Sequence, residues 1–198
     1  PTRRSSDLCM ACVEKCHRNA ITIKDDLKYY NALIDTKKCV DCGLCTKVCP
    51  RENDNDMSKP KWWYQGWADS EIREHASSGG AASAIIRAFI KHGGYVASCL
   101  FDSGKFVFEV TNEMAVARKF AGSKYVKSNP EKIYGKIQSL VKANQKVLFI
   151  GLPCQVAAVN QFIKDKTNLV TADLICHGTP SPYLLKKCLQ EYGHDINT

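Results

Sequence analysis

The chain contains four cysteines within eleven residues, Cys39, Cys42, Cys45 and Cys49, and Pro50 follows the last of them. Three closely spaced thiolates can bind three iron atoms of one 4Fe–4S cubane. The proline then turns the chain, so that the fourth cysteine can reach a second cubane. A zinc site is the alternative, but it usually takes two separated cysteine pairs. The spacing therefore predicts an iron–sulfur site that passes single electrons.

A second cysteine group matches the last three cysteines of the same motif. By the pattern of two-cluster ferredoxins, the last cysteine of each group binds the other cluster. The expected ligands are Cys9, Cys12 and Cys49 for cluster I, and Cys16, Cys39, Cys42 and Cys45 for cluster II. The missing first cysteine would fall at position 6, where the sequence has serine. Cluster I is therefore expected to be absent or to hold three irons, and a chain with a single cluster is the alternative.

Both ends of the chain are expected to be artificial. Residues 1–8 match one reading frame of a sequencing-adapter oligonucleotide, so we exclude them from the fold prediction and expect a cysteine at position 6 of the native protein. The sequence stops at Thr198, just after a predicted helix. We therefore expect a fragment.

Composition narrows the class of protein. Eleven cysteines in 198 residues would also fit a secreted disulfide framework, but the N-terminus lacks the apolar segment of a signal peptide. Reduced thiols in the cytoplasm are therefore favoured. No apolar run approaches the roughly 18–20 residues of a membrane span. The net charge of +8 comes from scattered lysines and arginines. This scatter argues against a nucleic-acid partner.

The hydrophobic pattern predicts two structural units. Residues 9–50 form the cysteine-rich module, with a β-hairpin of strands at 20–24 and 29–34. Residues 51–61 are a polar linker. Residues 62–198 form an α/β domain with a largely parallel sheet, because strands and helices alternate along it. We expect its helices at 80–92, 131–143, 154–164 and 181–192, and its strands at 95–101, 105–110, 147–150 and 168–175.

The linker is followed by four aromatic residues, Trp62, Trp63, Tyr64 and Trp67. We expect them to pack between the two units. A partner-binding surface is the alternative.

Two loops of the α/β domain have residue types that bind phosphate. Ser77, Ser78, Gly79 and Gly80 open the helix at 80–92, where free N–H groups and the helix dipole attract an anion. Gly122, Ser123 and Lys124 combine a glycine, a hydroxyl and a cation. Either loop alone also fits an ordinary helix cap or turn.

Two further loops follow predicted parallel strands, whose carboxyl ends commonly bind ligands. Gly151 and Cys154 belong to the first loop and Cys176 to the second. Gly151 is therefore a cofactor-binding candidate, and the two cysteines could approach each other as catalytic candidates. A cysteine at a helix N-terminus has a lowered pKa and more thiolate character. Cys99 and Cys188 are expected to be small buried residues.

Taken in order, the cluster motif, Ser-Ser-Gly-Gly, Gly-Ser-Lys-Tyr-Val, Gly-Leu-Pro-Cys-Gln and Cys-His-Gly-Thr-Pro-Ser-Pro resemble the coenzyme F420 hydrogenase/dehydrogenase beta subunit family. The resemblance extends over nearly the whole chain from Cys9. It implies an FAD-binding α/β domain behind a two-cluster ferredoxin module. By this resemblance Ser78, Gly79, Gly80, Ser123 and Lys124 hold FAD, and Cys154 and Cys176 bind a further cluster or act as a redox thiol. The sequence departs from the family pattern at Ala76, Ala121 and Leu152.

These features predict an iron–sulfur flavoprotein oxidoreductase of the cytoplasm. A flavin accepts two electrons together as a hydride and releases them singly, whereas a cubane carries one. The protein is expected to couple two-electron chemistry of a small organic substrate at FAD to one-electron transfer through the clusters. The deazaflavin coenzyme F420 is one candidate substrate, and a partner subunit or electron-transfer protein is expected. The alternatives are a non-enzymatic electron-transfer subunit that docks a catalytic partner, and a zinc-stabilised interaction module.

Overall fold

The N-terminal unit is a small antiparallel sheet with two short helices. The computed structural model describes residues 3–5, 9–27, 30–53 and 59–196. The predicted hairpin is confirmed as β2 (Ile21–Asp25) and β3 (Tyr30–Ile34). The helices α1 (Ala11–Lys15) and α2 (Leu44–Lys47) lie within the two cysteine groups. Both are too short for a 3.6-residue period to reveal them in the sequence.

A third strand, β1 (Arg3–Ser5), pairs its backbone antiparallel with β3, so the strand order is β1-β3-β2. Because residues 1–8 were left out of the fold prediction, this strand was not predicted. An extended segment beside a sheet edge gains backbone hydrogen bonds whatever its side chains are. Position 6, where a cluster I ligand was expected, lies outside the described residues.

The second unit is built on a four-stranded sheet of order β5-β4-β6-β7. Its strands are β4 (Tyr95–Asp102), β5 (Lys105–Thr111), β6 (Val147–Gly151) and β7 (Leu169–Asp173). β4, β6 and β7 run parallel, and β5 is an antiparallel edge strand. All five residues of β6 are buried, as expected for a central strand covered on both faces. The predicted α/β fold with a largely parallel sheet is confirmed.

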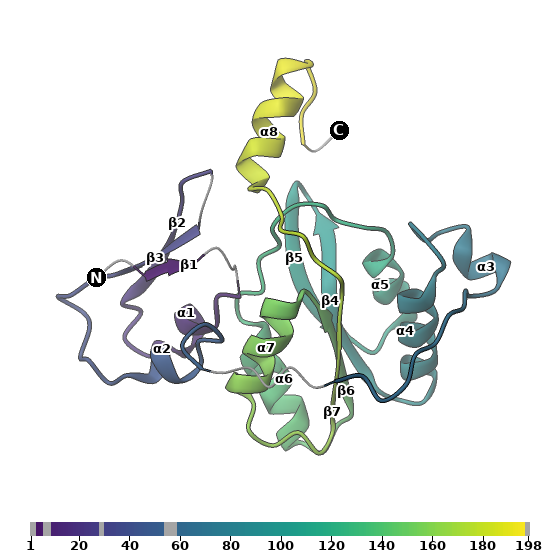
Figure 1. Cartoon of the computed structure of the whole chain (residues 1–198), viewed down its shortest axis with the longest axis horizontal. Coiled ribbons are helices and arrows are strands. Elements are labelled where there is room, and N and C mark those ends of the chain that lie inside the picture. The colour runs from purple at the N-terminus through teal and green to yellow at the C-terminus, as the bar shows by residue number, and fades with distance from the viewer. Residues whose placement is uncertain (1–2, 6–8, 28–29, 54–58, 197–198) are drawn as a thin grey trace.

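Helices cover both faces of this sheet (Figure 1). On one face α6 (Ile133–Lys142) and α7 (Pro153–Phe162) pack against Val147 and Phe149. On the other face α4 (Ala81–Lys91) and the 3₁₀ turn η1 (Arg118–Phe120) pack against Leu148 and Ile150. Two short helices, α3 (Ser70–Arg73) and α5 (Met114–Ala117), lie beside α4. The four predicted helices are thus present close to their expected bounds.

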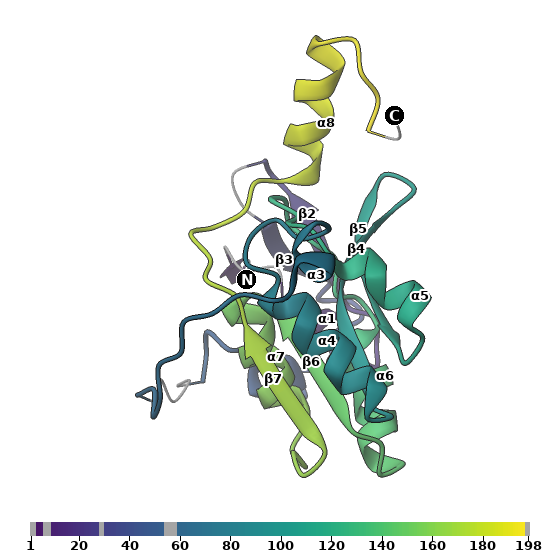
Figure 2. The same cartoon turned by 90° about the vertical axis from the view of Figure 1, so that its right-hand side faces the viewer.

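The last helix, α8 (Pro182–Glu191), stands apart from the sheet (Figures 1 and 2). None of its residues is buried, although Ser181 just before it is completely covered. Cys188 lies on this helix and is exposed, so the prediction that it is a buried residue is wrong. None of the helices in the described ranges is long and apolar enough to cross a membrane.

The two units share one apolar core, at a contact that we call the junction. Cys9 and Ala11 of the first unit are buried in the same cluster as Tyr134 and Phe162 of the second. The hydroxyl group of the completely buried Tyr134 donates a hydrogen bond to the carbonyl group of Cys9. The ammonium group of Lys15 lies 4.3 Å from the centre of the Phe162 ring, within range of a cation–π interaction.

The junction also completes helix α6. The sequence predicts an N-cap at Asn129, but that side chain accepts the Glu131 N–H at 2.8 Å in a turn, and α6 starts only after Lys132. The carboxylate of Glu14 accepts the N–H groups of Tyr134 at 3.2 Å and Gly135 at 2.5 Å. A carboxylate at a helix N-terminus accepts hydrogen bonds from the free N–H groups, and its negative charge interacts favourably with the positive end of the helix dipole. The cap of α6 therefore comes from the other unit.

The aromatic residues after the linker take no part in the junction. Trp62, Trp63, Tyr64 and Trp67 are between 72 and 90% exposed. The prediction that they pack between the units is wrong, because α1, α6 and α7 make that contact instead.

We predict that Glu14→Ala loosens the junction. Tyr134 and Gly135 would each lose a hydrogen-bond acceptor, at a cost of about 1–2 kcal/mol for a lost helix cap. Their amide hydrogens should then exchange with solvent roughly five- to thirtyfold faster in hydrogen–deuterium exchange of the whole chain. Glu74→Ala, which removes an exposed carboxylate at the end of α3, is the matched control. Equal exchange in the two variants would contradict this role for Glu14.

Candidate metal centre and cofactor loops

The four expected ligands of cluster II surround one cavity. This cavity measures about 350 Å³, and Cys16, Cys39, Cys42 and Cys45 all line it. Gly43 lies among them with a φ of +69°, a conformation that favours glycine, and it begins α2 between two of the ligands. The Ala20 N–H donates to the sulfur of Cys16 at 3.3 Å, the kind of contact that tunes a bound cluster. These residues fit a 4Fe–4S cubane.

The expected ligands of cluster I lie at the junction. Cys9 is only 8% exposed, and Cys12 and Cys49 are partly buried. Burial raises the pKa of the Cys9 thiol to about 12 and that of Cys12 to about 11. Repulsion among the nearby thiolates, with Cys49 acting on both, raises them further. Cluster binding therefore has to displace protons from these two thiols, because the thiolate is the ligand.

The geometry differs from that of a mononuclear site. Among the described residues, no three His, Cys, Asp or Glu side chains lie close enough together to hold a single metal ion. Thiolates around a cubane stand farther apart, since iron and sulfide atoms lie between them. The cluster II ligands line a cavity that would hold these atoms.

The two catalytic candidates lie in different surroundings. Cys154 is in the first turn of α7 and is partly buried, and its charge interacts with Cys9 and Tyr134 of the junction. Cys176 lies in the exposed loop after β7, where its sulfur accepts the Gly178 N–H at 3.3 Å. The structure therefore brings Cys154 to cluster I, a neighbour that sequence reasoning missed. A contact between Cys154 and Cys176 stays a prediction.

The two phosphate-type loops meet in the structure. The hydroxyl oxygen of Ser77 accepts the Ser123 N–H at 2.6 Å, although 46 residues separate them. Gly80 caps α4 with a φ of +78°, and Gly122 has a φ of +80°. A β-carbon at Gly80 would also approach Ala68 to 3.1 Å. The two loops that contain the expected residues Ser77, Ser78, Gly79, Gly80, Gly122 and Ser123 are thus in contact near the start of α4.

Lys124 interacts with its own loop in this structure, and its expected contact with FAD stays a prediction. Its ammonium group donates to the carbonyl groups of Lys119, Phe120, Ala121 and Gly122 at 2.8–3.3 Å. Burial lowers the pKa of this ammonium group. Lys124 therefore closes the end of η1 and shapes the loop, with its donors directed at the protein backbone.

Gly151 is required by packing at the end of β6. A β-carbon there would lie 2.8 Å from the Phe149 ring and 3.0 Å from the side-chain oxygen of Gln155. Gln155 is buried; its oxygen accepts the Leu152 N–H at 2.9 Å and its amide donates to Ser128 at 3.0 Å. Gln155 thus fixes the turn that carries Cys154, a role that the motif alone did not reveal.

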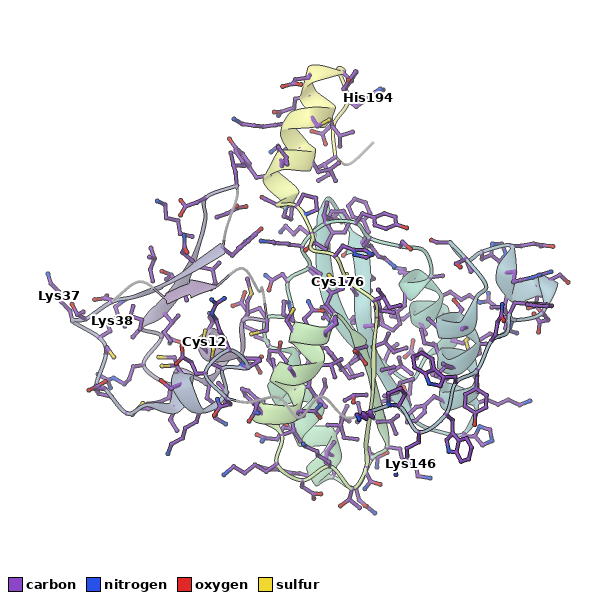
Figure 3. All side chains as sticks on the ribbon, in the orientation of Figure 1. Cys12, Lys37, Lys38, Lys146, Cys176 and His194 are labelled. Atoms are coloured by element: carbon purple, nitrogen blue, oxygen red, sulfur yellow. The ribbon has the colours of Figure 1, made fainter. Side chains whose placement is uncertain are left out.

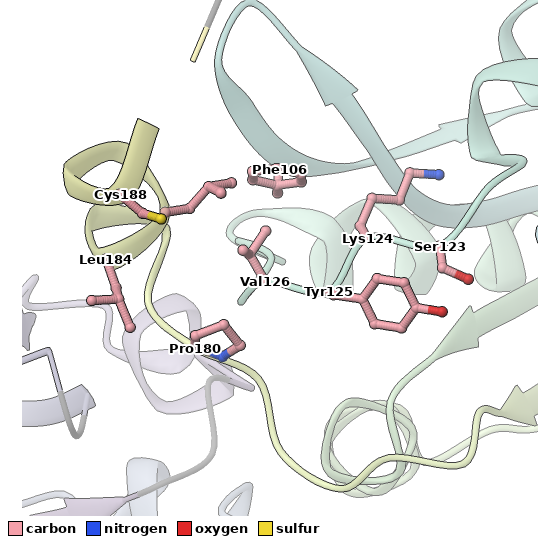
Figure 4. Close-up of a pocket in the computed structure, with 9 residues that line it drawn as sticks. Phe106, Ser123, Lys124, Tyr125, Val126, Pro180, Leu184 and Cys188 are labelled. Carbon is pink, nitrogen blue, oxygen red and sulfur yellow. The ribbon is translucent and has the colours of Figure 1, made fainter. Parts of the chain in front are cut away.

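Two cavities flank these loops. One, of about 350 Å³, lies between the Ser123–Val126 loop and α8, and Figure 4 shows Leu184 and Cys188 on one side of it and Tyr125 on the other. The second, of about 610 Å³, lies between α3, α4 and α5 and includes His75, Arg87 and Arg118. Ser123 lines the first cavity and Ala121 lines the second. The two residues that flank Gly122 in the sequence therefore face different cavities.

Comparison with known families agrees with both units. Residues 7–53 match the family described as the 4Fe-4S dicluster domain. Residues 144–198 match the family described as the C terminus of the beta subunit of coenzyme F420 hydrogenase/dehydrogenase. The second match covers the C-terminal part of the α/β domain, so this part of the chain is similar to that beta subunit. The two matches agree with the family resemblance and the dicluster module expected from the motifs.

Two individual proteins are similar to this chain. An uncharacterized protein of Methanocaldococcus jannaschii is 27% identical over 141 residues, which cover 66% of this chain and 39% of that protein. A chain of the F420-reducing nickel–iron hydrogenase complex of Methanosarcina barkeri superimposes with a TM-score of 0.54 and 19% identity, covering 66% of this chain and 49% of that chain. At that identity the likeness concerns the fold alone. The chain thus spans less than half the length of either protein. Neither name mentions a flavin, so FAD binding stays a prediction.

We predict that Cys16→Ala removes cluster II or degrades it to three irons. Iron should fall by about one to four atoms per chain in the anaerobically reconstituted protein, since a cubane holds four and a site with three cysteines can keep three. Iron and acid-labile sulfide analysis measures this. Cys188→Ala, which changes an exposed cysteine on α8, is the matched control. A fall in the control, or unchanged iron in Cys16→Ala, would refute the ligand set.

Proposed function

We propose that this chain is the electron-transfer and flavin-binding part of an oxidoreductase. It would couple two-electron chemistry of an organic substrate at FAD to single-electron transfer through 4Fe–4S clusters. The observation that carries the proposal is the junction, where the expected cluster I ligand Cys9 and the sheet of the α/β domain share one apolar core. A dicluster module tethered only by the 51–61 linker would not hold its clusters at a fixed place against a cofactor domain.

The rigidity of the junction supports an electron-transfer role. Sites built on rigid elements keep donor and acceptor groups at constant separation. Here Glu14 caps α6, Tyr134 binds the Cys9 carbonyl, and Cys154 lies beside both. The first turn of α7 therefore links cluster I to the carboxyl edge of the sheet, where α/β proteins commonly bind cofactors.

The loops at the start of α4 fit the pyrophosphate of FAD. An eleven-residue helix begins there without a side-chain cap, so its first N–H groups remain available to an anion. The hydroxyl groups of Ser78 and Ser123 are exposed beside them. The mainly apolar cavity at Tyr125 and Leu184 supplies a place for an aromatic ring and limits the access of water. A bound flavin would accept two electrons together from a substrate and release them one at a time to a cluster, or carry out the reverse.

The substrate of this reaction is a small redox-active organic molecule. Coenzyme F420 is the first candidate, because the beta-subunit family and the Methanosarcina barkeri complex carry its name. The activity of a longer protein would depend on parts outside this chain as well.

A second function is supported by the exposed aromatic residues Trp62, Trp63, Tyr64 and Trp67. Large exposed apolar groups mark surfaces that bind other proteins. By this alternative the chain is a non-enzymatic electron-transfer subunit, and the α/β domain docks a separate catalytic partner. The solved relative is itself part of a multi-subunit complex.

An absorption spectrum with iron and flavin analysis separates the two proposals. The protein is purified and reconstituted anaerobically with iron, sulfide and FAD. Flavin bands above a broad iron–sulfur shoulder support the oxidoreductase, and reduction of that flavin by F420 would identify the substrate. Protein that contains iron but no flavin would contradict the oxidoreductase proposal and favour the electron-transfer subunit.

We predict that Ser77→Ala weakens FAD binding. Loss of the Ser77–Ser123 hydrogen bond separates the two loops, and we expect the dissociation constant of FAD to rise about tenfold, or about 1.4 kcal/mol. Fluorescence titration with FAD measures the constant. Ser139→Ala, on the exposed side of α6, should leave it unchanged. The same constant in both variants would speak against a shared binding surface.

A further inference from the structure

The two cluster sites differ in their access to solvent. Cluster I lies at the junction, where Cys9 is buried. Cluster II opens outward, since two of its ligands, Cys39 and Cys42, are exposed. Figure 3 shows Lys37 and Lys38 at the edge of the module away from the α/β domain, with Cys12 between that edge and the domain. A protein that approaches from outside therefore reaches cluster II first.

The rim of cluster II forms a surface that we call the cluster II face, made of Arg18, Lys37, Lys38, Val40 and Lys47. Arg18 and Val40 line the cavity, and the three lysines directly neighbour residues that line it. All four cationic side chains are exposed. They outnumber the two carboxylates of the rim, Asp35 and Asp41, and Asp35 already pairs with Lys38 at 3.8 Å. The face thus has a basic rim.

The cluster II face also includes one exposed apolar side chain. Val40 is 55% exposed and is adjacent to the ligand Cys39. A small apolar centre surrounded by charged residues is the usual anatomy of a protein-docking surface. Charge on the rim steers a partner of opposite sign and raises the rate of association.

We propose that the cluster II face docks an acidic one-electron carrier protein. A cubane held by Cys16, Cys39, Cys42 and Cys45 would take up one electron that the carrier loses, and it would pass this electron on to a cluster held by Cys9, Cys12 and Cys49 at the junction. Only an electron would be transferred in each case, and no bond would form or break. The proposal rests on the dicluster module and deepens the proposed function by naming the partner and its surface.

The test compares charge-reversed variants of the whole reconstituted protein. The double variant Lys37→Glu with Lys38→Glu reverses two charges of the face, and Lys146→Glu, on the far side of the α/β domain in Figure 3, is the control. The probe is a reduced acidic flavodoxin, whose one-electron oxidation to the neutral semiquinone gives a long-wavelength band apart from the main cluster band. Stopped-flow spectroscopy gives the second-order rate constant of cluster reduction.

We expect the double variant to react about tenfold or more slowly than the unaltered protein at low ionic strength, with Lys146→Glu unchanged. The difference should shrink as salt is added, because exposed charges are screened. The variant with glutamine at both lysine positions should fall between the two. A neutral photochemical reductant should reduce all variants at one rate, which verifies intact clusters.

Equal rates for the double variant and the control would overturn the proposal, as would a rate independent of salt. Failure of this proposal can be told apart from failure of the proposed function. If the protein binds iron but no flavin, the rate of cluster reduction still tests the docking face. If the protein binds flavin and the variants react at equal rates, the oxidoreductase proposal is kept and the docking face is rejected.

Discussion

The arrangement of both units depends on one helix end. Helix α6 starts without a cap of its own, and the carboxylate of Glu14 from the cysteine module supplies it. The same helix presents the Tyr134 hydroxyl group to the Cys9 carbonyl, so α6 fixes α1 and the first cysteine loop together. Burial raises the pKa of Glu14, because the carboxylate gives up water for these N–H donors. The polar contacts set the orientation, and the shared apolar core makes it rigid.

The sequence was most informative where the deciding interactions are local. Cysteine spacing predicted the four residues that surround the cluster II cavity, and the apolar run at 147–150 predicted the central strand. It was uninformative where a partner is distant along the chain. Glu14 looked like an ordinary charge in a cysteine loop, because its partners lie about 120 residues away. Lys124 looked like a phosphate ligand, because its residue type does not show that carbonyl groups will occupy its donors.

The same limit explains the errors at the surface. Four aromatic residues in a short segment were expected to be covered, since burial of large apolar groups lowers the free energy. The junction was already filled by Tyr134, Phe162 and the residues around Cys9, so these rings stay in solvent. The pairing of β1 with β3 depends on backbone groups alone, and no side-chain pattern predicts it. Both cases show that tertiary contacts, rather than residue type, decided the outcome.

The burial of Cys9 by α6 and α7 also sets an order of events during synthesis. All seven cysteines of the module leave the ribosome before Tyr134 and Phe162 exist. At translation rates of about 5–20 residues per second, the first cysteine loop therefore stays uncovered for on the order of ten seconds. Iron and sulfide can reach the inner site during this interval. Once α6 and α7 pack against the loop, the Cys9 thiol is shielded from solvent and oxidants, so the fold separates the time when this ligand is accessible from the time when it is covered.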